Sequence, residues 1–305
     1  MNFSTAPEQR DFAASLRELL ASSDVVSVAR AWATGDVAPG RKLWSRLGEM
    51  GVLSLGAAES GATPVDLVLG FEELGRAAVP GPLVESVAVL PVLGIDPGDG
   101  LATLALPPHV PFAVDAAVAD VVYLVEGGTL FTATVSATAT SVDPARRLAE
   151  VVPADKVGPV DPAAAFELGA LATAAQIHGA GAALLHRSTE YAMQRKQFGR
   201  LIGSFQAVKH LLADAYVALE VARPLLFGAA LAIGSPTETR DVSAAKVACT
   251  DAAYRSSRAA LQVHGAIGYT AEYDLALWLT KVRALVSAWG TQRTHRDRVL
   301  GAIRG

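Results

Sequence analysis

Apolar residues recur at steps of three and four along the first part of the chain, a period typical of amphipathic α-helices. Thr5 and Glu8 form a capping box that predicts the start of the first helix. A second helix should end at Gly51, because glycine is favoured just beyond a helix C-terminus. A third helix should begin near Pro64 and stop before Pro80, since proline suits a first turn and restricts the residue before it.

The pattern changes after residue 95, where β-branched and aromatic residues become frequent. The runs VVYLVE and TLFTATVSATATSV flank Gly127 and Gly128. Two glycines between strand-like runs are a strong signal for a β-hairpin. Residues 96–158 are therefore predicted to form a β unit, which is small for an independent binding domain.

The helical period returns at Asp161, which precedes a proline and so marks a favourable helix start. That helix should run to about Met193, and Ser204 is expected to cap the next one. Another helix should span roughly 237–264, and the stretch LALWLTKVRALVSAWG should form the last one. The predicted fold class is thus mainly α with a small β unit. Its expected domains are a helical domain over 1–95, the β unit over 96–158 and a four-helix bundle over 159–305.

Composition narrows the possible functions. A net charge of −4 gives no global field that would favour nucleic acid. The lone Cys249 excludes an intrachain disulfide and a cysteine cluster, and the six histidines lack metal-ligand spacing, so we expect no metal. The uncharged run 168–186 contains glutamine, histidine and small residues, which indicates a buried helix and no membrane span. No signal-peptide pattern is evident at the start, so a cytoplasmic protein is expected.

Three motifs, in order and suitably spaced, resemble those of the acyl-CoA dehydrogenase family. They are WSRLGEMGVLSLGAAESGATPVDLVLGFEELGRA, RKQFGRLIGSFQAVKHLLAD and QVHGAIGYTAEYDLALWLTKVRAL. The resemblance implies the fold of that family: an N-terminal helical domain, a middle β-domain and a C-terminal four-helix bundle. It also implies FAD as the cofactor and the introduction of an α,β double bond into an acyl-CoA as the reaction.

The RKQFG motif carries the cofactor residues that the resemblance implies. In the family, its arginine and phenylalanine contact the FAD of a neighbouring subunit. Arg195 would accordingly pair with the pyrophosphate, for which a guanidinium fork is well suited, and Phe198 would contact the nucleotide end, with Gln197 a weaker candidate. Further candidates lie in two later turns: Gln262, Gly265, Ala266 and Thr291. Ala266 replaces the second glycine of the family, so the backbone would approach FAD less closely there.

The catalytic base of the family is missing from its usual place. It is a glutamate in a Tyr-Glu-Gly-Thr turn, whereas this chain has Ala-Trp-Gly-Thr with Trp289 at the glutamate position. Indole has no basic group, so Trp289 is interpreted as a packing residue that fills or caps the acyl pocket. Some members hold the base on the helix before the RKQFG motif. Glu167 lies near that level but out of register, and the other interpretation is a first-turn carboxylate that complements the helix dipole.

The β unit also lacks the family segments that hold the flavin ring. Both losses resemble the non-catalytic subunit of actinobacterial α2β2 acyl-CoA dehydrogenases, which act on steroid-derived CoA thioesters. The first hypothesis is therefore a subunit that completes the FAD site of a catalytic partner and shares its acyl-CoA substrate. One alternative is a self-sufficient homodimeric enzyme with Glu167 as a relocated base. The other is a non-enzymatic member of the family that acts as a structural or regulatory binder.

Overall fold

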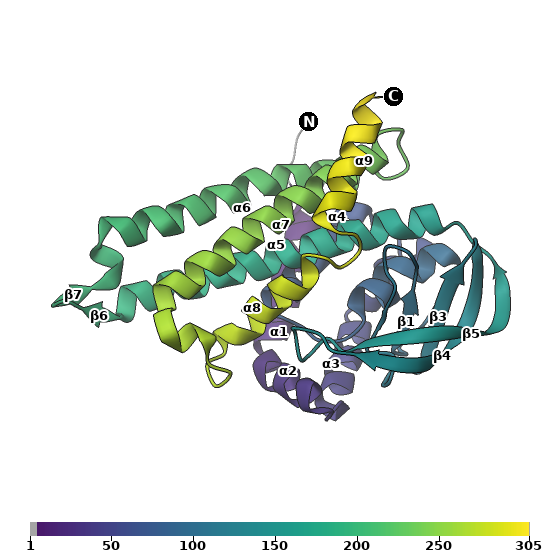
Figure 1. The fold of residues 1–305 in the computed structure, drawn as a ribbon, viewed down its shortest axis with the longest axis horizontal. Helices are drawn as coiled ribbons and strands as arrows, with labels where there is room; N and C mark the ends of the chain where they lie inside the picture. Colours follow the sequence, from purple (N-terminus) through teal and green to yellow (C-terminus); the bar gives the residue numbers. More distant parts are fainter. Residues whose placement is uncertain (1–4, 305) are drawn as a thin grey trace.

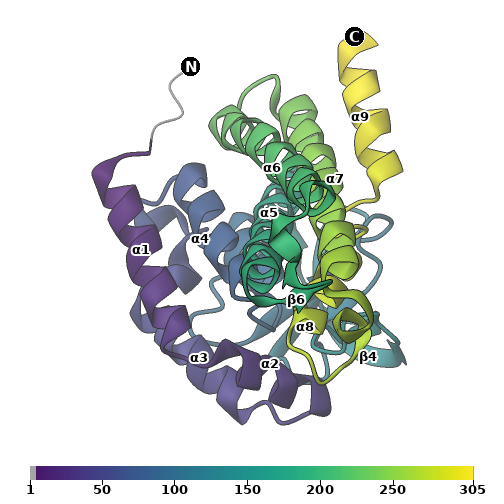
Figure 2. The same cartoon turned by 90° about the vertical axis from the view of Figure 1, so that its left-hand side faces the viewer.

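The computed structural model describes residues 5–304, which form N-terminal helices, a β-sheet and a helix bundle in that order (Figure 1). The first part contains α1 (Pro7–Ala21), α2 (Val25–Thr34), α3 (Ala38–Glu49) and α4 (Pro64–Arg76), followed by a π-helical turn at Val84–Val89. In Figure 2, α1, α2 and α3 border one side of the molecule, while α4 lies next to the central helix of the bundle.

Local chemistry explains most of these boundaries. The α4 helix starts at Pro64 as predicted, and Gly51 has the left-handed φ of 81° expected after α3. The first helix, however, begins one residue later than the Thr5 capping box predicts. Ala6 is its N-cap, and the Ala6 amide donates to Gln9 Oε1 at 3.0 Å in place of the expected glutamate.

The middle part of the chain forms a five-stranded sheet in the order β1-β3-β4-β5-β2. Only the β1–β3 pair is parallel. The predicted hairpin joins β3 to β4 through Gly127 and Gly128, whose φ values of 57° and 74° fit a type I′ turn. The strand bounds are β1 (Ala102–Ala105), β2 (Ala113–Val114), β3 (Val121–Glu126), β4 (Thr129–Ala139) and β5 (Leu148–Pro159).

Long helices form the C-terminal part: α5 (Pro162–Gln194), α6 (Gln206–Ala232), α7 (Glu238–His264), α8 (Leu275–Leu285) and α9 (Gln292–Arg304). Asp161 caps α5 as predicted, since its Oδ1 accepts from the Ala163 amide at 2.8 Å. Ser204 does not cap α6. It lies in a 3₁₀ turn, its hydroxyl donates to the Leu201 carbonyl, and Phe205 is the N-cap.

The bundle packs closely against the N-terminal helices, and one apolar core cluster runs through both and into the sheet. At the crossing of α4 and α5 the two backbones touch. A Cβ on Gly75 would lie 2.0 Å from the Gln176 carbonyl oxygen, and one on Gly179 would lie 1.9 Å from that of Glu72. Only glycine permits this approach, which fixes how α4 lies across the bundle.

Two helices of the bundle, α5 and α6, are long and apolar enough to cross a membrane by length and composition. Most of the apolar stretch of α5 is buried inside the protein. Buried core helices of compact bundles meet the same criterion, so length and composition do not distinguish a core helix from a membrane span.

Candidate functional site

The RKQFG motif forms a short hairpin that projects from one end of the bundle (Figure 1). Strands β6 (Lys196–Gln197) and β7 (Arg200–Leu201) pair, and Phe198 and Gly199 form the turn with φ values of 52° and 76°. A left-handed phenylalanine is unfavourable by roughly 1–2 kcal/mol, and asparagine or glycine is preferred there. Phe198 is also 92% exposed. An exposed aromatic side chain on an unfavourable backbone conformation is more typical of a residue that contacts a ligand or partner than of a structural residue.

The cationic groups of the hairpin are mostly free. Arg195 and Gln197 are exposed, and within residues 5–304 the Arg195 side chain makes no hydrogen bond or ion pair. The Arg200 guanidinium stacks 4.0 Å above the Phe205 ring, and Phe198 meets that ring edge-on at 6.3 Å. The hairpin thus presents an unpaired guanidinium fork beside an aromatic face, which suits the phosphates of a nucleotide.

The second predicted turn lies at the same end of the bundle (Figure 1). Gln262, Gly265 and Ala266 are exposed where α7 ends. The Tyr191 ring stacks on His264 at 4.2 Å and so connects the end of α5 to the end of α7. Gly265 has φ 63° and ψ −142°, a conformation essentially limited to glycine.

Thr291 is not brought together with these residues. The α8 helix, 11 residues long, separates the second turn from Thr291 by about 16 Å along its axis. The Thr291 hydroxyl accepts from the Thr294 amide at 3.1 Å and therefore caps α9. Its role toward the cofactor stays a prediction.

Trp289 lies deep inside the protein, with 1% of its surface exposed. Its indole Nε1 donates to Glu85 Oε1 at 3.0 Å, and its carbonyl oxygen lies 2.8 Å from His295 Nε2. A Cβ on Gly169 would lie 2.1 Å from the indole ring, so the ring occupies the space that this glycine leaves. The cavity that remains beside Trp289 has a volume of about 20 Å³, enough for about one water molecule and too small for an acyl chain.

Glu85 lines the small cavity beside Trp289, and the sequence pattern did not single it out. Burial raises the pKa of Glu85, and the nearby Arg146 only partly offsets that effect. Burial likewise lowers the pKa of His295 to about 4. The available signal was a single acid in the apolar run PLVESVAVLPVL. Because Trp289 covers Glu85, this carboxyl has no access to a substrate-sized space.

Glu167, the alternative base, is buried in the second turn of α5, one turn later than the first-turn position that a helix-dipole role implies. It forms an ion pair with Arg298 and accepts from the Thr239 hydroxyl at 2.9 Å. The Arg298 guanidinium in turn stacks on Phe166 at 4.7 Å. Glu167 therefore connects α5 to α7 and α9, an arrangement that favours a structural role.

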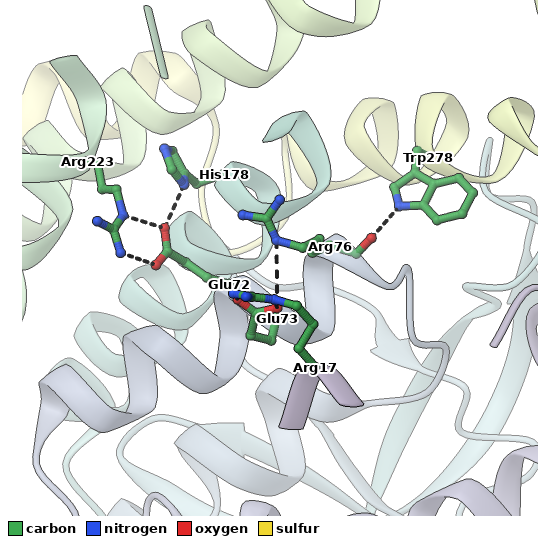
Figure 3. Close-up of polar contacts among 7 residues, drawn as sticks. All are labelled: Arg17, Glu72, Glu73, Arg76, His178, Arg223 and Trp278. Carbon is green, nitrogen blue, oxygen red and sulfur yellow. Dashed lines mark hydrogen bonds and ion pairs between the residues drawn. The ribbon is translucent and has the colours of Figure 1, made fainter. Parts of the chain in front are cut away.

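A buried charged cluster between α4, α5 and α6 was also missed (Figure 3). Glu72 lies 2.8 Å from His178 Nδ1 and 3.4 Å from the Arg223 guanidinium. Burial alone would raise the pKa of Glu72, but His178 and Arg223 together hold it below its usual value. The EELGR motif contains this glutamate, yet its partners lie more than 100 residues away along the chain. No group of three or more potential metal ligands gathers anywhere in residues 5–304.

Helical domain, sheet and bundle in this order, with a cationic hairpin at the bundle end, define the class of an acyl-CoA dehydrogenase fold. The family described as "Acyl-CoA dehydrogenase, C-terminal domain" matches residues 161–303. Acyl-CoA dehydrogenase IpdE2 of Mycobacterium tuberculosis is 33% identical over 302 residues, which cover 91% of this chain and 92% of that protein. The chain belongs to the acyl-CoA dehydrogenase family, an oxidoreductase family of FAD-dependent flavoproteins.

Solved structures share the fold over nearly the whole chain. The crystal structure of the ChsE4–ChsE5 complex from Mycobacterium tuberculosis matches with a TM-score of 0.84 at 22% identity, covering 100% of this chain and 99% of that chain. A variant of the Tcur3481–Tcur3483 steroid ACAD matches with a TM-score of 0.82 at 18% identity, covering 97% and 98%. Both matches confirm the predicted fold class.

Proposed function

We propose that this chain is a non-catalytic subunit of a hetero-oligomeric, FAD-dependent acyl-CoA dehydrogenase. Its hairpin residues Arg195 and Phe198 would contact the pyrophosphate and nucleotide end of an FAD whose ring is held by a partner subunit. Gln197, Gln262, Gly265 and Ala266 would complete that surface. When bound, FAD accepts the hydride that leaves the β-carbon of the acyl-CoA. The base that removes the α-proton would come from the partner.

The observation that carries this proposal is the contrast between two regions. The hairpin is open, exposed and cationic, and it fits a phosphate group. The region around Trp289 is filled, with a cavity of only about 20 Å³ and a buried glutamate bonded to the indole. A chain that presents a surface suited to one end of FAD but has no room for an acyl chain beside Trp289 is expected to share a site with another chain.

The heteromeric partner and the substrate class are further parts of the proposal. The structural likeness to one chain of the ChsE4–ChsE5 complex supports an acyl-CoA dehydrogenase partner, and we propose an α2β2 assembly. The likeness to the Tcur3481–Tcur3483 steroid ACAD supports a steroid-derived CoA thioester as substrate. At these identities both arguments are analogies at the level of the fold.

The test is co-purification of the tagged chain with an acyl-CoA dehydrogenase subunit from the same source. The chain alone should purify without flavin, and the complex should bind FAD and reduce it with acyl-CoA. Replacing Arg195 with Ala should weaken FAD binding by roughly 10- to 150-fold, the usual effect of losing a charge-assisted hydrogen bond. Arg293→Ala is the matched control, because Arg293 is an exposed arginine on α9.

Two outcomes would contradict the proposal. If the isolated chain binds FAD and oxidises acyl-CoA, the chain is a self-sufficient enzyme. If Arg195→Ala and Arg293→Ala complexes retain the same flavin content and activity as the unchanged complex, the hairpin does not contribute to the FAD site. The second result would favour a non-enzymatic member of the family.

A further inference from the structure

A pocket of about 280 Å³ lies between the C-terminal ends of α1 and α4, the start of α2, and parts of α5 and α8. It shares no lining residue with the hairpin or with the small cavity beside Trp289. Its walls are largely apolar and come from Leu20, Val25, Val26, Ala77 and the Trp278 ring. Apolar walls with a few convergent polar groups are typical of small-molecule sites.

Arg187 of α5 is the polar group that distinguishes this pocket. Its guanidinium lies 3.8 Å above the Trp278 ring, which is itself fixed because Trp278 Nε1 donates to the Arg76 carbonyl at 2.8 Å (Figure 3). Within residues 5–304 the Arg187 side chain makes no hydrogen bond or ion pair. Partial burial lowers its pKa, because few water molecules solvate the charge.

The neighbouring acids do not neutralise Arg187 directly. Asp274 pairs with Arg30 at 2.9 Å, and Glu190 lies 3.4 Å from His186. A guanidinium that is partly desolvated and has its N–H donors free is an effective anchor for an anion. Stacking on Trp278 holds it in one orientation before any ligand arrives, which reduces the entropic cost of binding.

The rest of the pocket adds positive charge. Arg17 donates to Glu73 at 2.6 Å and Arg76 lies 3.6 Å from the same glutamate, so one carboxylate holds two arginines at the pocket wall (Figure 3). The other acid in the lining is Asp24, which caps α2. Three arginines and two carboxylates thus line the pocket, which leaves one positive charge in excess.

We propose that this pocket binds a compact amphipathic carboxylate, with the carboxylate on Arg187 and a short hydrocarbon body against Leu20, Val25 and Val26. The free guanidinium favours an anion, and the apolar walls favour an aliphatic body over a bare inorganic ion. The Arg17–Glu73 bridge is part of the wall and limits the length of the body. This binding activity is separate from the proposed FAD half-site and does not depend on it.

The test is calorimetric titration of hexanoate into the 305-residue chain, with hexan-1-ol and hexylamine as comparators. Hexanoate should bind at least about tenfold more tightly than hexanol, and hexylamine should not bind. Arg187→Gln should weaken hexanoate binding about tenfold or more, whereas Arg293→Gln should leave it unchanged. Circular dichroism should verify that each variant is folded.

A second variant keeps Arg187 and reduces only the volume of the pocket. Ala21 is an exposed residue of the lining at the end of α1, so Ala21→Trp should narrow the pocket without disturbing the core, and it should weaken hexanoate binding. Equal affinity for hexanoate and hexanol would overturn the proposal. So would unchanged hexanoate binding in folded Arg187→Gln and Ala21→Trp proteins.

Discussion

Trp289 Nε1 donates a hydrogen bond to Glu85 Oε1 at 3.0 Å, and both side chains are buried. The pair joins the turn after α8 to the π-helical turn that follows α4, across 204 residues of sequence. Trp289 itself has a left-handed φ of 53°, so the bond holds an unfavourable backbone conformation in place. The pair explains why the pocket beside it is closed, and it gives direct tests of that closure.

The contact between Trp289 and Gly169 should show strong coupling in a double-mutant cycle. Gly169→Ala should destabilise the fold by about 1–3 kcal/mol, because its Cβ would lie 2.1 Å from the indole. Trp289→Ala should cost about 3–5 kcal/mol. The double variant should be more stable than the sum predicts by about 0.5–3 kcal/mol, since the methyl group added at position 169 then occupies vacated space. Urea denaturation measures each value.

Gly301→Ala is the control for that cycle. Among residues 5–304, no atom of a neighbouring group lies within 4 Å of a Cβ at Gly301 on α9, so this change should stabilise the helix by about 0.5–1 kcal/mol. Strict additivity of Gly169→Ala and Trp289→Ala would mean that the indole does not occupy the space beside residue 169.

Glu85 should make the fold less stable as the pH rises. Burial raises its pKa in the folded state above the ordinary value of 4.5, so the folded state binds more protons than the unfolded state above that pH. The stability contribution is complete below the unfolded pKa and is lost as the pH rises through the folded pKa. Glu85→Gln removes the titration and keeps a hydrogen-bond acceptor for Trp289. The free energy of unfolding of the variant should therefore increase relative to that of the unchanged protein between about pH 5 and about pH 8.

Urea denaturation at both pH values gives this difference directly. The comparison of the two proteins cancels the contributions of other titrating groups to first order. If the difference in stability between Glu85→Gln and the unchanged protein is the same at both pH values, Glu85 does not hold a proton in the folded state.

Lys246 should have the opposite pH dependence. Burial lowers its pKa from 10.5 to about 7, so between these values the unfolded state binds more protons and stability rises with pH, by at most about 1.4 kcal/mol per pH unit. Lys246→Met should remove that rise. The variant should therefore gain relative to the unchanged protein as the pH falls toward about 7, although it loses the hydrogen bond that Lys246 Nζ donates to the Leu285 carbonyl at 3.2 Å.

Lys42→Met, at an exposed lysine of α3, is the matched control and should retain the rise in stability with pH. Thermal unfolding between about pH 7 and about pH 9 is the measurement. If the stability of Lys246→Met rises with pH as steeply as that of the control, a group other than Lys246 causes the pH dependence.

Long periodic elements could be predicted from the sequence, but short ones and tertiary pairings could not. The helix expected over 237–264 is observed at Glu238–His264, because its period is long and its end is marked by glycine. The short α2 and the polar α9 were not predicted as separate helices. In α9, QRTHRDRVLGAIR has no continuous apolar stripe, and its attachment depends on Arg298 and His295 reaching partners on other helices.

The candidate site shows the same difference between local motifs, which could be predicted, and tertiary contacts, which could not. Arg195 and Phe198 lie within one contiguous motif, so a local pattern was sufficient to find them. The bond between Glu85 and Trp289 joins two segments that no periodicity relates. The free guanidinium of Arg187 depends on which acids pair with other residues, and that is settled only by the fold.

Glu167 should prove structural in function as well as in position. Glu167→Gln leaves Arg298 without its partner and should destabilise the fold by about 3–5 kcal/mol, the usual result of breaking a buried pair. The complex with the catalytic partner should nevertheless keep its turnover at a temperature where the variant is folded. Adding Arg298→Met should restore part of the stability. Lost turnover with unchanged stability and flavin content would instead identify Glu167 as the base.

Phe198 should allow hairpin stability to be separated from cofactor binding. Asparagine before glycine is the preferred pair for a type I′ turn, so Phe198→Asn should relieve about 1 kcal/mol of unfavourable backbone conformation. It also removes the aromatic face, so the complex should bind FAD more weakly although the chain is more stable. Flavin content of the complex and thermal unfolding of the chain are the two measurements. Phe205→Leu is a control that keeps the Phe198 turn but removes the ring beneath Arg200. A Phe198→Asn complex with full flavin content would show that the exposed ring has no part in the site.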